Sequence, residues 1–386
     1  MEKQAEMESR NTHRMKIVAG LGAIDKYPRF VQAGADEFFC GYVPYEWNRK
    51  YGTRYPLNRR EVLCSHVQIG AFSELEILAK MVGKLGKPVH LTFNSLYYLP
   101  EQYAEIASIV RKCMELGFHS YIIADPALIL YLRQEKIDCE IHLSGETAEV
   151  NRRMVQYFSQ WGLKRVIFHR KNTFKDMHSV IESVEIPKKR GEAGGLDVEN
   201  KLEWEAFALN ELCQFNGSFC NSLHCDELGH LCRVPYRVVR EIKDGLEKYQ
   251  RDEAIKNAQS KSRNTDGEKM CDGDRIADEC KTRQKEMCAD SRNQEKQLGA
   301  PDEDGYLCGM TGCGLCALYS LREAGITHLK LVGRGNYADF MERDIRNLRK
   351  ALELLEQSES ERAYVREMKK ELFPGGCSGM CYYIKI

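Results

Sequence analysis

The sequence predicts a (β/α)8 barrel of the TIM type, with a cysteine-rich loop region and a long charged insertion. Eight short apolar segments alternate with helical segments, which indicates parallel strands joined by helices. The cysteine-rich stretch follows directly after the seventh apolar segment, where a barrel carries its functional loops. A doubly wound open sheet is the alternative, but no Gly-x-Gly-x-x-Gly motif follows the first strand.

The strands are expected where short apolar runs follow a helix and a turn. They lie at residues 15–20, 37–41, 88–94, 120–124, 139–144, 165–169, 204–209 and 327–332. The first two strands and the helix between them form a βαβ unit, in which Gly34 closes the helix. This unit implies parallel strands, and the same alternation continues along the chain.

The helices are expected where apolar residues recur at helical spacing. They lie at residues 25–34, 73–86, 100–117, 127–134, 151–162 and 173–184, and after the last strand at 336–356 and 359–371. Residues 42–60 are expected to form a long loop rich in Tyr and Arg.

These elements divide the chain into five parts. Residues 1–14 are expected to form a disordered tail, and residues 15–243 to hold the first seven strands with the first cysteine cluster. Residues 244–304 have few large apolar side chains, so we expect a disordered charged insertion. Residues 305–358 hold the second cysteine cluster, the last strand and its helix, and residues 359–386 hold a final helix and a cysteine-rich tail.

Composition limits the classes of partner and location. The chain has 57 basic and 57 acidic residues, so its net charge does not indicate nucleic acid or an anionic membrane. A peptide or a small molecule is the expected substrate. No run of about eighteen apolar residues predicts a membrane span, and the polar amino terminus lacks the apolar core of a signal peptide. We therefore expect a cytoplasmic protein.

Sixteen cysteines in a reducing compartment favour metal binding over disulfides. Two glycine-containing stretches, residues 213–232 and 308–316, place thiols at short intervals, as a soft metal or an iron–sulfur cluster requires. His224 and His230 leave a zinc site open as an alternative. Cys377 and Cys381 form a further pair, for which a second metal is also left open.

Polar residues at the ends of the expected strands are the other candidates for a site. The proposed catalytic residues are Asp125, His142 and His169, and the proposed substrate-binding residues are Asn94, Arg170 and Arg334. We expect the two histidines to face the barrel mouth, where they could move protons; the alternative for each is a hydrogen-bonded structural histidine. The guanidinium groups could bind a carboxylate or a phosphate.

Several motifs, taken in order, resemble peptidase family U32, the collagenase-like proteases. They are Ala33-Gly-Ala-Asp36, Ala124-Asp-Pro126, Ile141-His-Leu-Ser144, Phe207 to Cys213 with Cys220 after six residues, Gly229-His-Leu-Cys-Arg233 and Lys330-Leu-Val-Gly-Arg334. The sequence departs from the family pattern at residues 145–150 and at Val332, where the family usually has an acid.

The resemblance implies one of two chemistries. Some U32 members are described as collagenase-like proteases; others, which modify RNA or act in the ubiquinone pathway, bind a [4Fe-4S] cluster and hydroxylate without oxygen. Carried onto this chain, the resemblance implies Cys213, Cys220, Cys232 and Cys308 as cluster ligands, with Cys225, Cys313 and Cys316 as alternates.

Three classes of function follow. The first is an iron–sulfur enzyme, such as an oxygen-independent hydroxylase or an enzyme that modifies RNA or a cofactor. The second is a metal-dependent peptidase, although the sequence has no His-Glu-x-x-His or Gly-x-Ser-x-Gly motif. The third is a non-catalytic protein whose loops are held by zinc. An electron-transfer protein or another family member is a possible partner of the first class.

Overall fold

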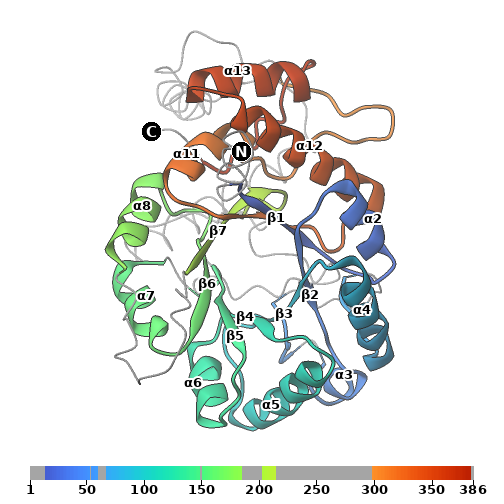
Figure 1. Ribbon diagram of the computed structural model, residues 1–386. Coiled ribbons are helices and arrows are strands. Elements are labelled where there is room, and N and C mark those ends of the chain that lie inside the picture. Colours follow the sequence, from blue (N-terminus) through green and yellow to red (C-terminus); the bar gives the residue numbers. More distant parts are fainter. Residues whose placement is uncertain are drawn as a thin grey trace, which may run out of the picture. The chain divides into compact units, whose positions relative to one another are not determined.

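The computed structural model describes residues 14–52, 54–59, 67–147, 150–184, 202–213 and 298–383. Eight parallel strands close into a barrel in sequence order, because β8 pairs with β1 (Figure 1). The strands are β1 (Lys16–Gly20), β2 (Glu37–Gly41), β3 (Val89–Phe93), β4 (Ser120–Ile123), β5 (Glu140–Leu143), β6 (Leu163–Ile167), β7 (Glu203–Leu209) and β8 (His328–Leu331). The predicted (β/α)8 fold is confirmed.

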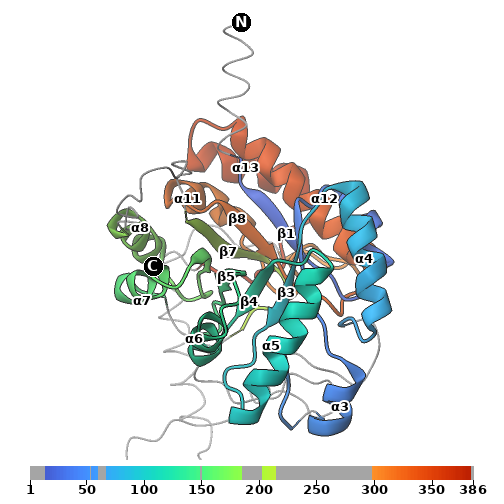
Figure 2. The ribbon, with the colours of Figure 1, turned by 60° about the horizontal axis from the view of Figure 1, so that its bottom comes forward.

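Helices surround the barrel and cover the outer face of the strands (Figures 1 and 2). They are α2 (Lys26–Ala33), α3 (Tyr45–Tyr51), α4 (Phe72–Leu85), α5 (Pro100–Glu115), α6 (Pro126–Gln134), α7 (Arg152–Ser159), α8 (Phe174–Ser183), α11 (Leu318–Glu323), α12 (Ala338–Glu356) and α13 (Glu361–Leu372), with a short 3-10 turn at Leu315–Ala317. Every helix predicted from the sequence is present.

Two helices were not predicted. Residues 42–60 were expected to form a loop, but α3 occupies part of them, and α11 precedes β8. Both helices are too short to show a helical period in the sequence, and each is held by burial, of Trp47 in α3 and of Leu318 and Leu321 in α11. The strand β6 also begins and ends two residues earlier than expected, so His169 follows the strand instead of ending it.

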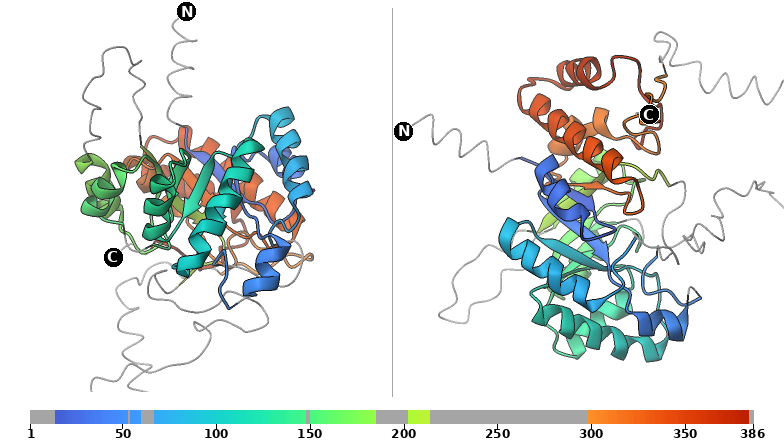
Figure 3. Two further views of the ribbon diagram at one scale, coloured as in Figure 1. Left: turned by 90° about the horizontal axis from the view of Figure 1, so that it is seen from below. Right: turned by 90° about the vertical axis from the view of Figure 1, so that its right-hand side faces the viewer.

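The last two helices complete the outer layer beside β1. The helix α12 packs against α2 and β1, and α13 packs on α12 from the outside (Figure 3, right). Arg349 of α12 reaches back to the first βαβ unit, where its guanidinium donates to the Gly34 carbonyl oxygen and pairs with Asp36. This contact ties the last part of the chain to the first, which supports closure of the barrel.

The inside of the barrel is divided into two layers. Because alternate residues of a strand point to the same face, the strands place inward-facing side chains at two levels. The apolar layer lies toward the carboxyl ends of the strands and comprises Val18, Phe39, Ile122, Ile167, Phe207 and Val332. The polar layer lies toward the amino ends and comprises Glu37, His90, Arg165, Glu205, His328 and Lys330.

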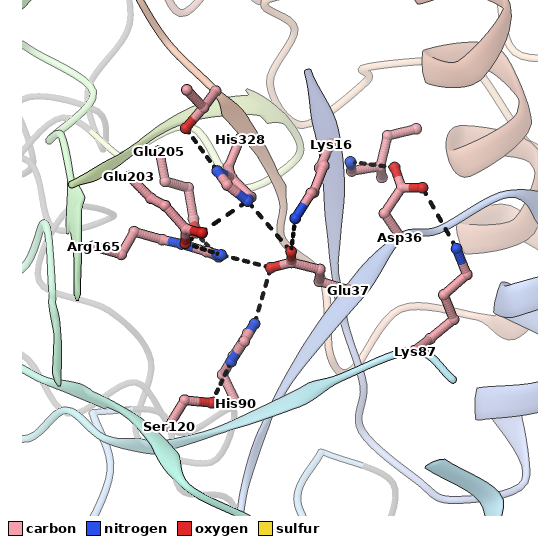
Figure 4. Close-up of polar contacts among 12 residues, drawn as sticks. Lys16, Asp36, Glu37, Lys87, His90, Ser120, Arg165, Glu203, Glu205 and His328 are labelled. Carbon is pink, nitrogen blue, oxygen red and sulfur yellow. Dashed lines mark hydrogen bonds and ion pairs between the residues drawn. The ribbon is translucent and has the colours of Figure 1, made fainter. Parts of the chain in front are cut away.

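Glu37 is the centre of the polar layer (Figure 4). Its carboxylate accepts from Arg165 at 2.6 Å and contacts the rings of His90 at 3.0 Å and His328 at 3.3 Å. Lys16 adds an ion pair at 2.9 Å. Ionic groups that are buried in this way persist only if nearly all their hydrogen bonds are made, which explains why four strands meet at one side chain.

The buried imidazoles make acid the weak point of this fold. Burial lowers the pKa of His90 and lowers that of His142 well below its ordinary value; Arg165 contributes in both cases. Both rings are therefore neutral in the folded chain, whereas the unfolded chain protonates them near pH 6.5. Stability from these residues is complete above that pH and is lost as the pH falls below it.

We expect the free energy of unfolding, measured with urea, to fall between pH 6.5 and 5 with a slope of about 1.4 kcal/mol per pH unit for each histidine. In His142→Gln this slope should be smaller by about 1.4 kcal/mol per pH unit, whatever the substitution does to stability at neutral pH. His178→Gln, at an exposed histidine on α8, is the control and should keep the wild-type slope. An unchanged slope in His142→Gln would show that His142 is protonated in the folded barrel.

Candidate functional site

The mouth of the barrel lies above the apolar layer, at the carboxyl ends of the strands. Charged side chains from loops after different strands meet there. Arg59 belongs to the segment after β2, Glu146 follows β5, Arg170 follows β6 and Arg334 follows β8. Each is mostly buried, so the mouth is an enclosed polar site and not an open surface.

Two glycines make room for Arg334. A β-carbon at Gly41, the last residue of β2, would lie 2.6 Å from the guanidinium Nη1 atom, and one at Gly20, the last residue of β1, would lie 3.2 Å from the Arg334 Cγ atom. The side chain therefore lies across the ends of β1 and β2. This placement agrees with the expectation that Arg334 belongs to the mouth.

Arg170 is held in place by an aromatic ring and a carboxylate. Its guanidinium lies 3.8 Å from the centre of the Phe207 ring, and its Nη1 atom lies 3.4 Å from Glu146 Oε1. The other Glu146 oxygen lies 3.1 Å from Arg59 Nε, so one carboxylate bridges two arginines. Burial opposes the charge on Arg170, but Glu146 and other neighbours raise its pKa, so it stays cationic.

Asn94 positions the segment that carries Arg59. Its side-chain oxygen accepts from the Arg59 backbone N–H at 3.1 Å, and its own backbone N–H donates to Asn58 Oδ1 at 3.4 Å. Asn94 follows β3 directly. The structure therefore brings the three predicted substrate-binding residues, Asn94, Arg170 and Arg334, to the same end of the barrel.

The predicted catalytic histidines occupy different places. We expected His142 to face the mouth, but it lies inside β5, and its ring packs on His90 of the polar layer with a centroid distance of 4.5 Å. That expectation was wrong because the alternation of side chains along β5 points His142 into the barrel, at the level of His90. His169 is fully buried in the turn after β6, where its ring nitrogen Nδ1 accepts from the Lys171 N–H at 3.3 Å.

Asp125 is engaged in local structure at the start of α6. One carboxylate oxygen accepts from the Ala127 N–H at 2.9 Å, which caps the helix. The other accepts from the Tyr103 hydroxyl at 2.8 Å. Burial raises the pKa of Asp125, and these hydrogen bonds oppose the rise. Its position fixes the start of α6 after β4, and a catalytic role for it stays a prediction.

The described cysteines of the two clusters lie on neighbouring loops. Cys213 follows β7, and Cys308, Cys313 and Cys316 precede α11. The two loops are joined by backbone hydrogen bonds, from Asn210 to Gly312 at 2.8 Å and from Leu212 to Thr311 at 2.7 Å. Cys220, Cys225 and Cys232 lie outside the described residues. Cys213 and the second group of thiols, about a hundred residues later in the sequence, thus lie at the same end of the barrel.

The donor chemistry of these loops suits a soft metal, because sulfur is the main potential ligand on both. Burial raises the pKa of the Cys308 thiol to about 12 and raises that of Cys313 well above its ordinary value, so both are protonated in the absence of a metal. Within the described ranges, no group of three or more possible ligands is close enough to hold a metal ion. The side chains of Cys213 and Cys308 offer sulfur donors of the kind that such a metal takes.

Two residues of the mouth, Arg59 and Tyr382, were not among the residues that the sequence indicated. Arg59 lies in the segment that the sequence marked as rich in Arg and Tyr, and the glycines that end β1 and β2 are also visible in the sequence. Tyr382 has no such signal, since it reaches the mouth only through the path of the last residues.

The family model described as Peptidase family U32 matches residues 22–379 of this chain. The chain belongs to peptidase family U32. The match begins just after β1 and spans β2 to β8 and both cysteine clusters.

Curated relatives match shorter stretches. "tRNA hydroxylation protein P1" of Bacillus subtilis (strain 168) is 23% identical over 175 residues, which is 45% of this chain and 37% of that protein. "tRNA hydroxylation protein P" of Escherichia coli (strain K12) is 28% identical over 103 residues, which is 26% of this chain and 22% of that protein. The chain thus spans less than half the length of these relatives.

Among solved structures, "The Structure of the U32 Peptidase Mk0906" is 14% identical, covers 50% of this chain and 69% of that chain, and has a TM-score of 0.35. Among the residues that the structure describes, no helix of this U32 protein combines the length and the apolar character that a membrane span needs.

The contact between Gly41 and Arg334 can be tested by a double-mutant cycle. Gly41→Ala should lower the free energy of unfolding by about 1–3 kcal/mol, because the added methyl group overlaps the guanidinium. The loss should shrink in an Arg334→Ala background, since the overlapping group is gone. Gly83→Ala, in α4 with open space around its β-carbon, is the matched control and should be neutral or stabilising. Equal losses in both backgrounds would contradict the placement of Arg334.

Proposed function

We propose that this U32 protein is a [4Fe-4S] enzyme that carries out an oxygen-independent hydroxylation on a substrate bound at the barrel mouth. The observation that carries the proposal is that the arginines and the thiol loop meet at β7: the Arg170 guanidinium lies 3.8 Å from the centre of the Phe207 ring, and Cys213 follows the same strand. The thiol-bearing loops and the arginines that can bind substrate therefore share one enclosed site. A redox enzyme must hold its redox centre close to its bound substrate.

The cluster ligands in this proposal are Cys213, Cys220, Cys232 and Cys308, with Cys225, Cys313 and Cys316 as alternates. When bound, such a cluster would supply one-electron redox chemistry. The residues of the chain itself supply binding and enclosure. The guanidinium groups of Arg59, Arg170 and Arg334 can hold an anionic substrate, and the apolar layer beneath them separates the mouth from the polar layer.

The names of the curated relatives support hydroxylation over proteolysis and bring tRNA to this chain as a candidate substrate. Phosphate groups of RNA match the arginines of the mouth. The balanced charge of the whole chain provides no large basic surface, so recognition of a long RNA would depend on local groups. A peptide or small-molecule substrate with a carboxylate fits the same arginines.

A peptidase is the second candidate, because one arrangement in the barrel has the order of a catalytic triad. Ser120 Oγ lies 2.5 Å from His90 Nδ1, and His90 Nε2 lies 3.0 Å from Glu37 (Figure 4). Three features oppose hydrolysis there. The residues are buried in the polar layer, far from the loops of the mouth. Glu37 is shared with Arg165, and burial lowers the pKa of His90, which makes it a weak base.

The cluster can be tested directly on the full chain purified without oxygen. We expect a broad visible absorption band with about four irons and four sulfides per chain. Cys213→Ala should lose the band and most of the iron. Cys113→Ala is the control, because Cys113 is buried in α5 and contributes only to packing. A colourless wild-type protein that holds zinc or no metal would refute the cluster.

The hydroxylase and the peptidase make opposite predictions for two variants. In cells that lack the endogenous protein, complementation with Arg170→Lys should lower the yield of a hydroxylated product, measured by mass spectrometry of tRNA nucleosides, by roughly tenfold or more. Ser120→Ala should leave that yield close to wild type when corrected for protein level. Loss of peptide cleavage in Ser120→Ala, without effect of Arg170→Lys, would favour the peptidase.

A further inference from the structure

The last described residues of the chain return to the barrel mouth. Tyr382 packs with the apolar layer, and its ring meets the Phe207 ring edge-on at a centroid distance of 6.5 Å. It is the one member of that apolar cluster, among its fully buried residues, that does not come from a barrel strand or its immediate end. The tail thus supplies a side chain to the enclosed site.

The backbone of the tail is fixed in this position. Cys313 donates its N–H to the Met380 carbonyl oxygen at 2.7 Å, and Tyr382 donates to the Cys313 carbonyl oxygen at 2.9 Å. Cys313 in turn forms a β-bridge with Leu209 at the end of β7. The tail is therefore an added strand-like segment beside the mouth, and not a loosely attached end.

Two glycines on either side of Cys313 make room for the aromatic rings. A β-carbon at Gly312 would lie 2.9 Å from Tyr382 Cε1, and one at Gly314 would lie 3.2 Å from Tyr383 Cε2. The Gly-Cys-Gly sequence, which the thiol pattern alone assigned to metal binding, thus also forms a seat for the tail. A side chain at Gly312 would overlap the tail, and one at Gly314 would require its neighbours to shift by a few tenths of an ångström.

The two tyrosines of the tail differ in their hydrogen bonds. The Tyr383 hydroxyl donates to the Phe207 carbonyl oxygen at 2.8 Å, and its ring packs on Phe174, so it serves as an anchor. The Tyr382 hydroxyl oxygen lies within reach of the Arg170 guanidinium, which can donate to it, but the hydroxyl has no acceptor for its own hydrogen among the described residues. Arg170 Nε is also buried without an acceptor among the described residues.

Buried donors without an acceptor cost free energy, so their persistence side by side suggests a bound group that is polar. Burial raises the pKa of Tyr382, which keeps the phenol a neutral donor next to a permanent cation. Glu146 and Glu211 are the acidic neighbours of Arg170. Glu146 is already shared with Arg59, so its charge is largely balanced within the mouth.

We propose that the Tyr382 hydroxyl and Arg170 Nε bind one oxyanion, a carboxylate or phosphate group of the substrate, and that the tail carries Tyr382 into the site for this purpose. The inference rests on the proposed function in that the mouth is the substrate site. The inference goes beyond the proposed function by naming a residue that touches the substrate and the chemical group that this residue recognises. A phenol and a guanidinium on one oxyanion form two charge-assisted hydrogen bonds in a desolvated site.

The test is a binding measurement that needs no turnover. Titration calorimetry on the full chain, purified without oxygen, uses inorganic phosphate in one arm and acetate in the other. We expect Tyr382→Phe to weaken binding of the preferred anion roughly tenfold or more, because one hydrogen bond to a charged group is lost. Tyr383→Phe is the matched control: it removes a hydroxyl from the next residue but should leave the dissociation constant within about twofold of wild type.

The outcomes separate this inference from the proposed function. Preference for phosphate would identify a phosphate ester as the recognised group, and preference for acetate a carboxylate. Wild-type affinity in Tyr382→Phe, or no binding of either anion to the wild-type chain at millimolar concentration, would overturn the inference. Loss of the cluster or of hydroxylation activity would not overturn this inference, because anion binding is measured without either of them.

Discussion

The carboxylate of Glu37 is the interaction on which the interior of the barrel depends. It stands on the second strand, yet its partners come from β1, β3, β6 and β8, so it links strands that are not neighbours in the sheet. Glu205 repeats the arrangement, with Arg165 at 3.0 Å and Lys330 at 2.7 Å. Because these charges satisfy one another, the amino end of the barrel is closed to substrate, and the apolar layer above it forms the floor of the mouth.

The mouth differs from the polar layer in how completely its charged groups are paired. At the amino end, cations and carboxylates alternate and little hydrogen-bonding capacity is left. At the carboxyl end, one carboxylate, that of Glu146, is shared by two arginines, and the Nε atom of Arg170 has no acceptor among the described residues. Ionic groups that are fully paired stabilise a fold, whereas buried donors with remaining capacity are typical of a binding site.

The barrel could be predicted because each βα unit is local: an apolar run, a turn and an amphipathic helix are visible in a window of about thirty residues. The placement of Asn94, Arg170 and Arg334 at one end of the barrel followed from their positions after expected strands. What failed depends on tertiary contacts. The short helix α3 exists because Trp47 is buried, and His142 belongs to the polar layer because its ring packs on that of His90 inside the barrel. Tyr382 could not be placed at all, since its position is set by pairing with Cys313.

The cysteines show why a sequence pattern alone can carry two meanings. Gly312-Cys313-Gly314 has the composition of a metal-binding turn, and in the structure the same residues bridge β7 to the tail and hold two tyrosine rings. These meanings are compatible, because a loop that must bring Cys308 near Cys213 also needs a fixed backbone, and the hydrogen bonds from residues 210 and 212 to residues 312 and 311 provide it. A loop ordered in this way holds its thiols in place before any metal binds, which lowers the entropy that binding must overcome. Because the tail pairs with Cys313 and packs Tyr382 against the apolar layer, the same backbone contacts fix the thiol loop and bring an aromatic side chain to the mouth.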